Sequence, residues 1–301
     1  MTKQATRPEG STSLGLVGTA PGLVVPTPGA VAVVLPGPPS ELRALWPRAL
    51  EVPEVRAVLA RARRPTRRVL RFYGASESLV ARALADAGGD GNGGEATICA
   101  RDFEIHVDLV VEPGAEARAD ALAASLAEPL GTYLFAEDER GVEEIVLDLC
   151  RARSLELATA ESCTGGLVAA RLTSVPGSSD VFVGGIVAYA NEVKEAELGV
   201  PAEVLQEHGA VSAETAEVMA EGARRRLGAD VGVSVTGVAG PGGGSEEKPV
   251  GLVYILAVTP DASHGITFDF PADRETIRRR ATVAALHLVR RLLSQPRHTQ
   301  V

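Results

Sequence analysis

The feature that most constrains the fold of this chain is the alternation of apolar strands with amphipathic helices over residues 138–296. Such alternation favours a layered sheet with helices on both faces. Helices are expected at 141–153, from about residue 164, and at 191–198, 201–206, 212–227 and 273–293. Strands are expected at 155–160, 181–190, 231–236, 252–258 and 265–270. This segment therefore reads as an α/β domain.

The residues before this segment divide into two smaller parts. Residues 65–135 follow the order β-α-β-β-α, which favours a small α+β module. Residues 1–60 are rich in Gly and Pro and contain only two short apolar strands and one helix. That is too little for a complete domain, so we expect the remnant of an α/β domain there. Ser76 and Ser212 are expected to cap the helices that follow them.

Composition argues against several classes of function. The chain has 301 residues and a formal net charge of −9, which leaves no basic surplus for a general nucleic-acid binder. Its three cysteines and five histidines have the spacing of neither a disulfide framework nor a metal site. No apolar run approaches the ~20 residues of a membrane span, and the N-terminus does not resemble a signal peptide. We therefore expect a cytoplasmic protein with no cofactor, metal, membrane or nucleic-acid partner.

Lysine usage is unusual in this chain. The basic residues number 30, but lysine occurs only as Lys3, Lys194 and Lys248. Asparagine occurs only as Asn92 and Asn191. A lysine can lose its proton when it is buried and then act as a base, whereas an arginine cannot. The few lysines that remain are thus candidates for a compact titrating amine.

The four residues 161–164, Glu-Ser-Cys-Thr, lie between an apolar strand and a helix. The free backbone N–H groups and the dipole of a helix N-terminus favour negative charge, so Ser162 is a candidate nucleophile there. Ordinary N-capping by Ser162 or Thr164 is the alternative. Cys163 is a rival nucleophile, although an isolated cysteine is more often a buried apolar filler. The turn alone leaves these readings open.

Two further segments also follow predicted strands. Lys194 ends the segment 187–194, and a desolvated lysine has a lowered pKa and can serve as a general base. A solvated helix lysine is the alternative. The glycine-rich residues 237–251 would let backbone N–H groups approach an anion or a carbonyl, unless they form a flexible surface loop. Ligands bind at the C-terminal edge of the strands in open α/β sheets, so we expect all three segments to meet there.

Six motifs in this part of the chain can be compared with known families. They are AESCTGG at 160–166, PGSS at 176–179, YANEVK at 189–194, HGAVS at 208–212, TGVAGP at 236–241 and GGSEEKPVG at 243–251. Together they resemble the CinA C-terminal domain family, whose stand-alone members are nicotinamide-mononucleotide amidohydrolases of the PncC type. The resemblance is highly specific and runs nearly continuously from residue 140 to residue 295.

The resemblance implies that the nicotinamide carboxamide is hydrolysed to nicotinate mononucleotide and ammonia, without a metal or cofactor. It implies Ser162 as the nucleophile, Lys194 as the general base and Tyr189 as a further residue of the catalytic site. The small-molecule nucleotide would be held by a wider set of residues, with an arginine of the final helix on its phosphate. This implied set is Glu161, Thr164, Gly165, Asn191, Ser234, Thr236, Gly237, Gly240 and either Arg274 or Arg278.

The other parts of the chain also resemble this family. Residues 1–60 are similar to the last third of its molybdopterin-binding-like domain, and residues 65–135 are similar to its KH-type module. Residues 138–296 would be the amidohydrolase domain. The nucleotide-binding motifs of the first domain are missing, so we do not expect its ADP-ribose pyrophosphatase activity. The glycine-rich loop at 88–94 has no basic residue, so we do not expect the KH-type module to bind nucleic acid.

Two expectations concern assembly. An exposed half-sheet at residues 20–36 would invite strand pairing, so we expect a homo-oligomer. The alternative to an enzyme is a non-catalytic binding or assembly protein linked to competence or DNA damage. The complete motif set, with Ser162 and Lys194 both present, favours the enzyme.

Overall fold

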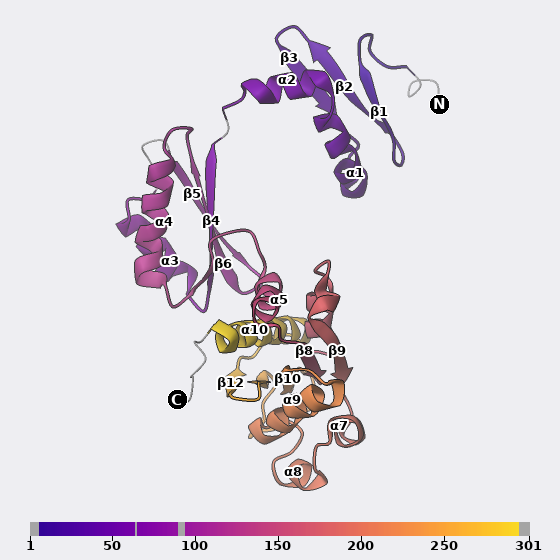
Figure 1. Ribbon diagram of the computed structural model, residues 1–301, viewed down its shortest axis with the longest axis vertical. Helices are drawn as coiled ribbons and strands as arrows, with labels where there is room; N and C mark the ends of the chain where they lie inside the picture. Colours follow the sequence, from indigo (N-terminus) through magenta and orange to yellow (C-terminus); the bar gives the residue numbers. More distant parts are fainter. Residues whose placement is uncertain (1–5, 64, 90–93, 295–301) are drawn as a thin grey trace. The chain divides into compact units, whose positions relative to one another are not determined.

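The computed structural model describes residues 6–63, 65–89 and 94–294, and the chain splits into two compact units, Met1–Thr66 and Arg67–Val301. The first unit has an antiparallel sheet with the order β1-β2-β3 and two helices (Figure 1). Its strands are β1 (Thr12–Leu16), β2 (Pro21–Thr27) and β3 (Ala30–Val34), and its helices are α1 (Pro39–Leu50) and α2 (Pro53–Arg61). Leu14, Val24 and Leu45 form the centre of its small core. The sequence predicted neither β1 nor α2.

The second unit begins with a module in the expected order β-α-β-β-α. Its four-stranded sheet has the order β5-β6-β4-β7, and Leu70, Phe72 and Leu126 lie in its core. Its elements are β4 (Thr66–Tyr73), α3 (Glu77–Asp86), β5 (Gly94–Arg101), β6 (Glu104–Val111), α4 (Glu116–Leu130) and the short β7 (Leu134–Ala136). Ser76 caps α3 by accepting from Leu79 N, as predicted. Residues 90–93 of the glycine-rich loop lie outside the described residues, and the KH-type assignment stays a prediction.

The rest of the second unit is the predicted layered α/β domain, with a five-stranded sheet in the order β12-β11-β10-β8-β9. The strands β8, β9 and β10 run parallel, whereas β11 and β12 are antiparallel to their neighbours. Its strands are β8 (Leu157–Glu161), β9 (Phe182–Val187), β10 (Val231–Gly237), β11 (Leu252–Val258) and β12 (Ser263–Asp269). Its helices are α5 (Val142–Arg153), α6 (Leu167–Thr173), α7 (Asn191–Leu198), α8 (Ala202–Glu207), α9 (Ala213–Leu227) and α10 (Arg274–Ser294).

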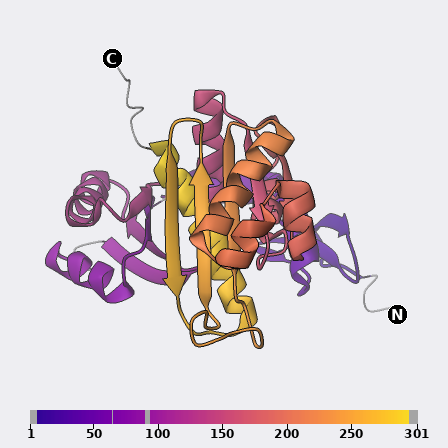
Figure 2. The same cartoon turned by 90° about the horizontal axis from the view of Figure 1, so that it is seen from below.

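Helices cover both faces of this sheet. Figure 2 shows α9 in front of the strands and α10 behind them, and both helices contact β10 and β11. Every residue of β8 is buried, because this strand lies between two neighbouring strands and is covered on both faces. The core on one face joins apolar side chains of α5, α6 and α10, and the core on the other face joins those of α7 and α9.

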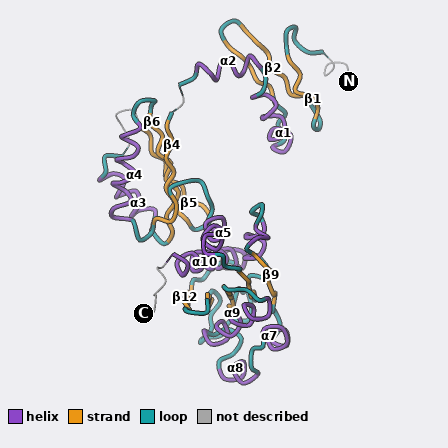
Figure 3. Tube along the Cα trace, viewed as in Figure 1, coloured by secondary structure: helices purple, strands orange, loops and turns teal. Residues whose placement is uncertain are grey.

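The three parallel strands end at the same edge of the sheet. The turn that contains Ser162 follows β8, α7 with Lys194 follows β9, and the glycine-rich loop follows β10. Figure 3 labels β9 and α7 in this domain and draws the loops in teal. Parallel strands carry their C-terminal ends to one side, and the register pairs Val235 of β10 with Glu161 of β8. The fold thus places the three candidate segments at one edge.

The helix that carries Lys194 lies very close to α9. The backbone carbonyl of Leu198, the last residue of α7, occupies the space where a side chain at Gly222 of α9 would begin. Any Cβ at position 222 would collide with that carbonyl, so only glycine allows the two helices to approach this closely.

A buried polar cluster joins β6 to α10. His287 and Glu104 are 1% and 2% exposed, and the imidazole Nε2 lies 2.9 Å from a carboxylate oxygen. His106 Nε2 contacts the other carboxylate oxygen at 3.2 Å. The ring of His287 stacks on Tyr73 with centroids 3.7 Å apart, and Arg290 Nε donates to its Nδ1 at 3.3 Å. Nε2 therefore carries the ring proton, and the imidazole is neutral.

Two pKa values in this cluster are depressed. Burial alone would raise the pKa of Glu104, but the hydrogen bonds from His106 and His287 outweigh burial and lower it to about 2. Burial lowers the pKa of His287 to about 4, because its contact with Glu104 only partly opposes the effect. Near neutral pH the pair is thus an ionised carboxylate that accepts hydrogen bonds from neutral imidazole.

Candidate active site

Ser162 and Lys194 lie within hydrogen-bond distance of each other at the C-terminal edge of the sheet. Lys194 Nζ is 3.2 Å from Ser162 Oγ, and the serine is 8% exposed. The position of Ser162 is set by its backbone N–H, which donates to Val235 O of the neighbouring strand at 2.9 Å. The nucleophile and the base that the sequence predicts are thus brought together from two different strand ends.

Lys194 is one of the most deeply buried charged side chains, with 1% exposure. Its Nζ also lies 2.8 Å from Ala188 O and 3.1 Å from Tyr189 O, the two residues that follow β9. No ion pair to Lys194 is found among the described residues. Burial lowers the pKa of Lys194, and the attraction of Cys163 and Glu192 opposes this only weakly. The amine therefore loses its proton more readily than an ordinary lysine.

Glu161 has a structural role in this conformation. It is 1% exposed, and its two carboxylate oxygens accept from the backbone N–H groups of Gly166, Val168 and Ala169. An acidic side chain at that position satisfies the free donors at the start of α6. Its carboxylate is thus committed to the helix, and a role in substrate binding stays a prediction.

The prediction that Thr164 caps the following helix is wrong. The helix begins at Leu167, later than expected, and its N-cap is Gly166, which has no side chain to accept a hydrogen bond. Gly165 and Gly166 both have positive φ angles, 62° and 96°, which delay the helix by two residues. Within the described part of the chain, the buried hydroxyl of Thr164 has no hydrogen-bond partner.

The structure weighs against Cys163 as the nucleophile. Its side chain is 4% exposed and packs into the core between the sheet and α10. Burial raises the pKa of the Cys163 thiol to about 12. A thiol needs its deprotonated form to attack, so this cysteine is inert at neutral pH.

A chain of hydrogen bonds extends the site from Tyr189 to the glycine-rich loop. Arg274 Nη2 donates to the phenol oxygen of Tyr189 at 2.9 Å, and its Nη1 donates to Gly240 O at 2.7 Å. Tyr189 is 59% exposed, and Arg274 is exposed as well. Three segments of the predicted site thus meet at a cationic group that solvent can reach.

Arg278, one helical turn further along α10, is placed differently. Its Nε donates to Cys163 O at 3.0 Å and its Nη2 donates to Thr164 O at 2.8 Å. The guanidinium therefore binds the backbone of the turn next to Ser162. These contacts make Arg274 the better candidate for a phosphate than Arg278.

Of the remaining predicted residues, Ser234, Thr236 and Gly237 pack against neighbouring segments, whereas Asn191 is exposed. Ser234 is fully buried and donates to Ala216 O of α9 at 2.5 Å, away from solvent. Thr236 Oγ1 donates to Ala210 O at 2.6 Å and so holds the segment before α9 against the end of β10. Gly237 packs against β11, where a side chain would meet Leu252 O. The exposed Asn191 begins α7, one turn before Lys194.

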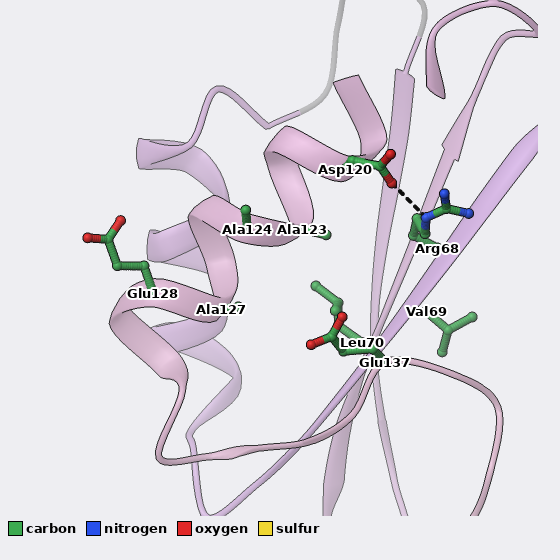
Figure 4. A pocket seen from close by; sticks show the side chains of 9 residues that line it. All are labelled: Arg68, Val69, Leu70, Asp120, Ala123, Ala124, Ala127, Glu128 and Glu137. Carbon is green, nitrogen blue, oxygen red and sulfur yellow. Dashed lines mark hydrogen bonds and ion pairs between the residues drawn. The ribbon is translucent and has the colours of Figure 1, made fainter. Parts of the chain in front are cut away.

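A pocket in the middle module is separate from these residues. It lies between β4 and α4, and Figure 4 shows Arg68 and Asp120 pointing toward one another at its rim. They form an ion pair at 2.8 Å. The lining contains apolar and charged side chains but neither serine, cysteine nor lysine. The pocket therefore has no counterpart of the Ser162–Lys194 pair and is not the candidate active site.

Sequence reasoning missed the backbone groups of the site. The carbonyls of Ala188 and Tyr189 orient the lysine, yet no side-chain pattern encodes them. The role of Glu161 could have been found, because a carboxylate directly before a helix start is typical of capping. Among the described residues, none of the helices is long and apolar enough to cross a membrane, and no group of three or more His, Cys, Asp or Glu could hold a metal ion.

Known proteins resemble the chain over nearly its full length. The profile of the CinA C-terminal domain matches residues 139–293. A CinA-like protein of Mycolicibacterium paratuberculosis is 45% identical over 300 residues, which cover 97% of this chain and 68% of that protein. A CinA-like protein of Mycobacterium tuberculosis is 43% identical over 296 residues, with coverage of 97% and 68%.

A solved structure resembles part of the chain. It is the competence/damage inducible protein CihA of Agrobacterium tumefaciens, at 40% identity and a TM-score of 0.50. The match covers 54% of this chain and 100% of that one. With the family profile and the long relatives taken together, the chain belongs to the CinA family.

Proposed function

We propose that this protein is an amidohydrolase that converts nicotinamide mononucleotide to nicotinate mononucleotide and ammonia through a serine nucleophile and a lysine base. The observation that carries the proposal is the buried Lys194 Nζ, 3.2 Å from Ser162 Oγ and held by two carbonyls. The choice of nicotinamide mononucleotide as substrate rests on the motif resemblance to PncC-type enzymes.

The hydrogen bonds of Lys194 fit a neutral amine. A neutral amine has two N–H groups and one lone pair. The carbonyls of Ala188 and Tyr189 can take both N–H groups, which leaves the lone pair for the hydroxyl proton of Ser162. Burial without an acidic partner favours this neutral form. The amine is thus oriented to act as a general base.

The proposed reaction has two halves. Ser162 Oγ attacks the carboxamide carbon while Lys194 accepts its proton, and the carbonyl oxygen becomes an oxyanion. The lysine then returns the proton to the leaving nitrogen, which departs as ammonia and leaves an acyl ester on the serine. In the second half, Lys194 takes a proton from water and the resulting hydroxide attacks the ester. Lys194 then returns the proton to Ser162 Oγ as the ester bond breaks, which releases the carboxylic acid and restores the free serine.

Arg274 supports binding of a phosphorylated substrate. It is exposed, and among the described residues each terminal nitrogen of its guanidinium has a single hydrogen-bond partner, Tyr189 or Gly240. A guanidinium binds phosphate oxygens well, because its planar fork offers several N–H groups. We therefore assign the phosphate to Arg274 and place Tyr189 beside it.

The test is ammonia release from nicotinamide mononucleotide, measured in EDTA with wild type, Ser162→Ala and Ser174→Ala. Ser174 is an exposed serine just after α6, so its variant controls for the chemical change alone. We expect activity in wild type and Ser174→Ala, and none in Ser162→Ala. Full activity in Ser162→Ala would refute the serine mechanism. A folded but inactive wild type would favour the binding or assembly role, and ADP-ribose cleavage with added divalent metal would favour a pyrophosphatase.

A further inference from the structure

We infer that Arg278 is a positioning residue that fixes the turn 162–165 so that its free backbone N–H groups face the developing oxyanion. The inference rests on the proposed function, because it assigns a role within the same site. It also removes Arg278 from the phosphate-binding residues, where the sequence resemblance had placed it as an alternative to Arg274.

The first three carbonyls of the turn are engaged. Ser162 O accepts from Gly165 N at 3.1 Å. Cys163 O and Thr164 O accept from Nε and Nη2 of Arg278 at 3.0 and 2.8 Å. One intrinsic hydrogen bond and one guanidinium thus fix three consecutive peptide planes, because the guanidinium is itself planar and rigid.

The N–H groups of the same peptide units point away from these carbonyls. In a trans peptide the N–H points opposite to the C=O. The N–H groups of Cys163 and Thr164 are therefore directed away from the carbonyls' partners, and neither donates to a backbone carbonyl within residues 6–63, 65–89 and 94–294. In nucleophile-elbow enzymes, the N–H of the residue after the nucleophile binds the oxyanion. The geometry gives this chain two such donors directly after Ser162.

The turn leaves little space beside the guanidinium of Arg278. A Cβ at Gly165 would lie 3.3 Å from Arg278 Nη2, and Gly165 has a φ of 62°. Arg278 is anchored in turn by α10, where Ile277 is fully buried and Thr282 Oγ1 donates to Arg278 O at 2.9 Å. The conformation of the turn and the position of the arginine thus depend on each other.

The two arginines of α10 should separate in kinetics. Loss of a donor to the transition state lowers kcat, whereas loss of a phosphate ligand raises KM. Removing one oxyanion donor outright costs about 10²–10³ in kcat, and loosening two donors through Arg278 should cost about 10- to 100-fold. We expect Arg278→Gln to lose kcat by that factor with an almost unchanged KM. Arg274→Gln should mainly raise KM.

The experiment measures kcat and KM for ammonia release in Arg278→Gln, Arg278→Lys and the control Arg279→Gln. Arg279 is the neighbouring exposed arginine, which pairs with Asp102 outside the turn. Lys offers one nitrogen in place of the planar fork that reaches both carbonyls, so Arg278→Lys should fall between wild type and Arg278→Gln, and it serves if Arg278→Gln does not fold. A raised KM with wild-type kcat, or wild-type values in both variants, would overturn the inference.

A second assay separates this inference from the choice of substrate. A fluorophosphonate probe reacts with an activated serine: the Oγ–P bond forms, fluoride leaves, and Lys194 takes the serine proton. Its phosphoryl oxygen needs the same N–H donors, but no nicotinamide is involved. We expect labelling of Ser162 to slow about 10- to 100-fold in Arg278→Gln and to stay at the wild-type rate in Arg279→Gln. Unchanged labelling in Arg278→Gln would overturn the inference even if nicotinamide mononucleotide is not the substrate.

Discussion

The molecule contains two buried polar clusters that differ in how their charge is compensated. In the Glu104–His287 cluster, the carboxylate accepts from two imidazoles, and an aromatic ring stacks on one of them. In the Lys194–Ser162 cluster, the amine faces a hydroxyl and two carbonyls, and no ion pair reaches it among the described residues. A compensated buried charge stabilises an interface. A buried amine without a counterion becomes reactive instead.

Lys194→Met should remove the proposed base of the Lys194–Ser162 cluster and give the largest effect of the substitutions considered. The variant keeps the length of the side chain but removes the base, so the rate of amide hydrolysis should fall about 10³- to 10⁴-fold. The free energy of unfolding should change by less than ~2 kcal/mol. Two carbonyls lose a donor, but the cost of burying a polar amine disappears.

Steady-state kinetics and urea unfolding of the same preparation test this prediction. The pH dependence of kcat/KM adds a second check in wild type. The pKa of Lys194 is lowered, so activity should rise with pH and reach its plateau below the ordinary pKa of lysine. A Lys194→Met variant with substantial activity would show that the lysine is not the base.

Glu104→Ala should disrupt the Glu104–His287 cluster and lower the stability of the protein. Removing the carboxylate leaves the buried His287 and the half-buried His106 without their acceptor, and the free energy of unfolding should fall by about 1–3 kcal/mol. At 25 °C the folded fraction should keep its kcat/KM within about threefold, because the cluster does not touch Ser162. Glu95→Ala, an exposed acidic residue of the paired strand β5, is the control and should cost less than about 0.5 kcal/mol. Equal stability of the two variants would contradict the prediction.

The pH dependence of stability sharpens the contrast. Glu104 has a pKa of about 2, below its ordinary value, so its contribution is present above about 4.5 and is lost as the pH falls toward 2. His287 has a pKa of about 4, so its contribution is present above about 6.5 and is lost as the pH falls toward 4. Acidification should therefore lower the free energy of unfolding in two pH ranges, first through His287 and then through Glu104. Each group should contribute a loss of up to about 1.4 kcal/mol per pH unit.

Urea unfolding at pH 7, 5 and 3 measures these slopes. Glu104→Gln should flatten the slope between pH 5 and 3 and leave the pH midpoint of catalysis unchanged. A shift of the catalytic midpoint in that variant would mean that the two clusters are coupled.

Tyr189→Phe should give the smallest effect. The substitution removes the phenol oxygen that accepts from Arg274 but leaves the backbone carbonyl that holds Lys194. One solvent-exposed hydrogen bond is worth about 0.5–1.5 kcal/mol, so kcat/KM should fall only about three- to tenfold. A loss as large as that of Lys194→Met would give the phenol a direct role in proton transfer.

Much of the fold follows from local patterns. The caps Ser76 and Ser212 accept from the predicted helix N-termini, and the strand predicted at 252–258 is found with those bounds. The strand β1 was missed because it is short and partly polar, and α2 was missed because Pro53 begins a short helix in a Pro-rich segment. Such elements owe their stability to packing, which a local pattern does not record.

The candidate site was predictable only in its side chains. The ends of three parallel strands brought Ser162, Lys194 and the glycine-rich loop to one edge, as topology requires. The commitment of Glu161 to α6 and of Arg278 to the turn depends on backbone groups whose direction becomes defined only when the strands pair. Sequence alone therefore named the residues but did not assign their partners.

The close approach of α7 to α9 at Gly222 has a consequence for natural variation. Gly222 holds no substrate and carries no reactive atom, yet the helix that it admits brings the amine to the serine. An alanine there would push α7 outward and lengthen the contact between Lys194 and Ser162, while most of the domain stays folded. Such a change removes no functional group, and it would still lower the turnover rate. The hydrogen atom at position 222 is thus as much a condition of the proposed reaction as the lysine itself.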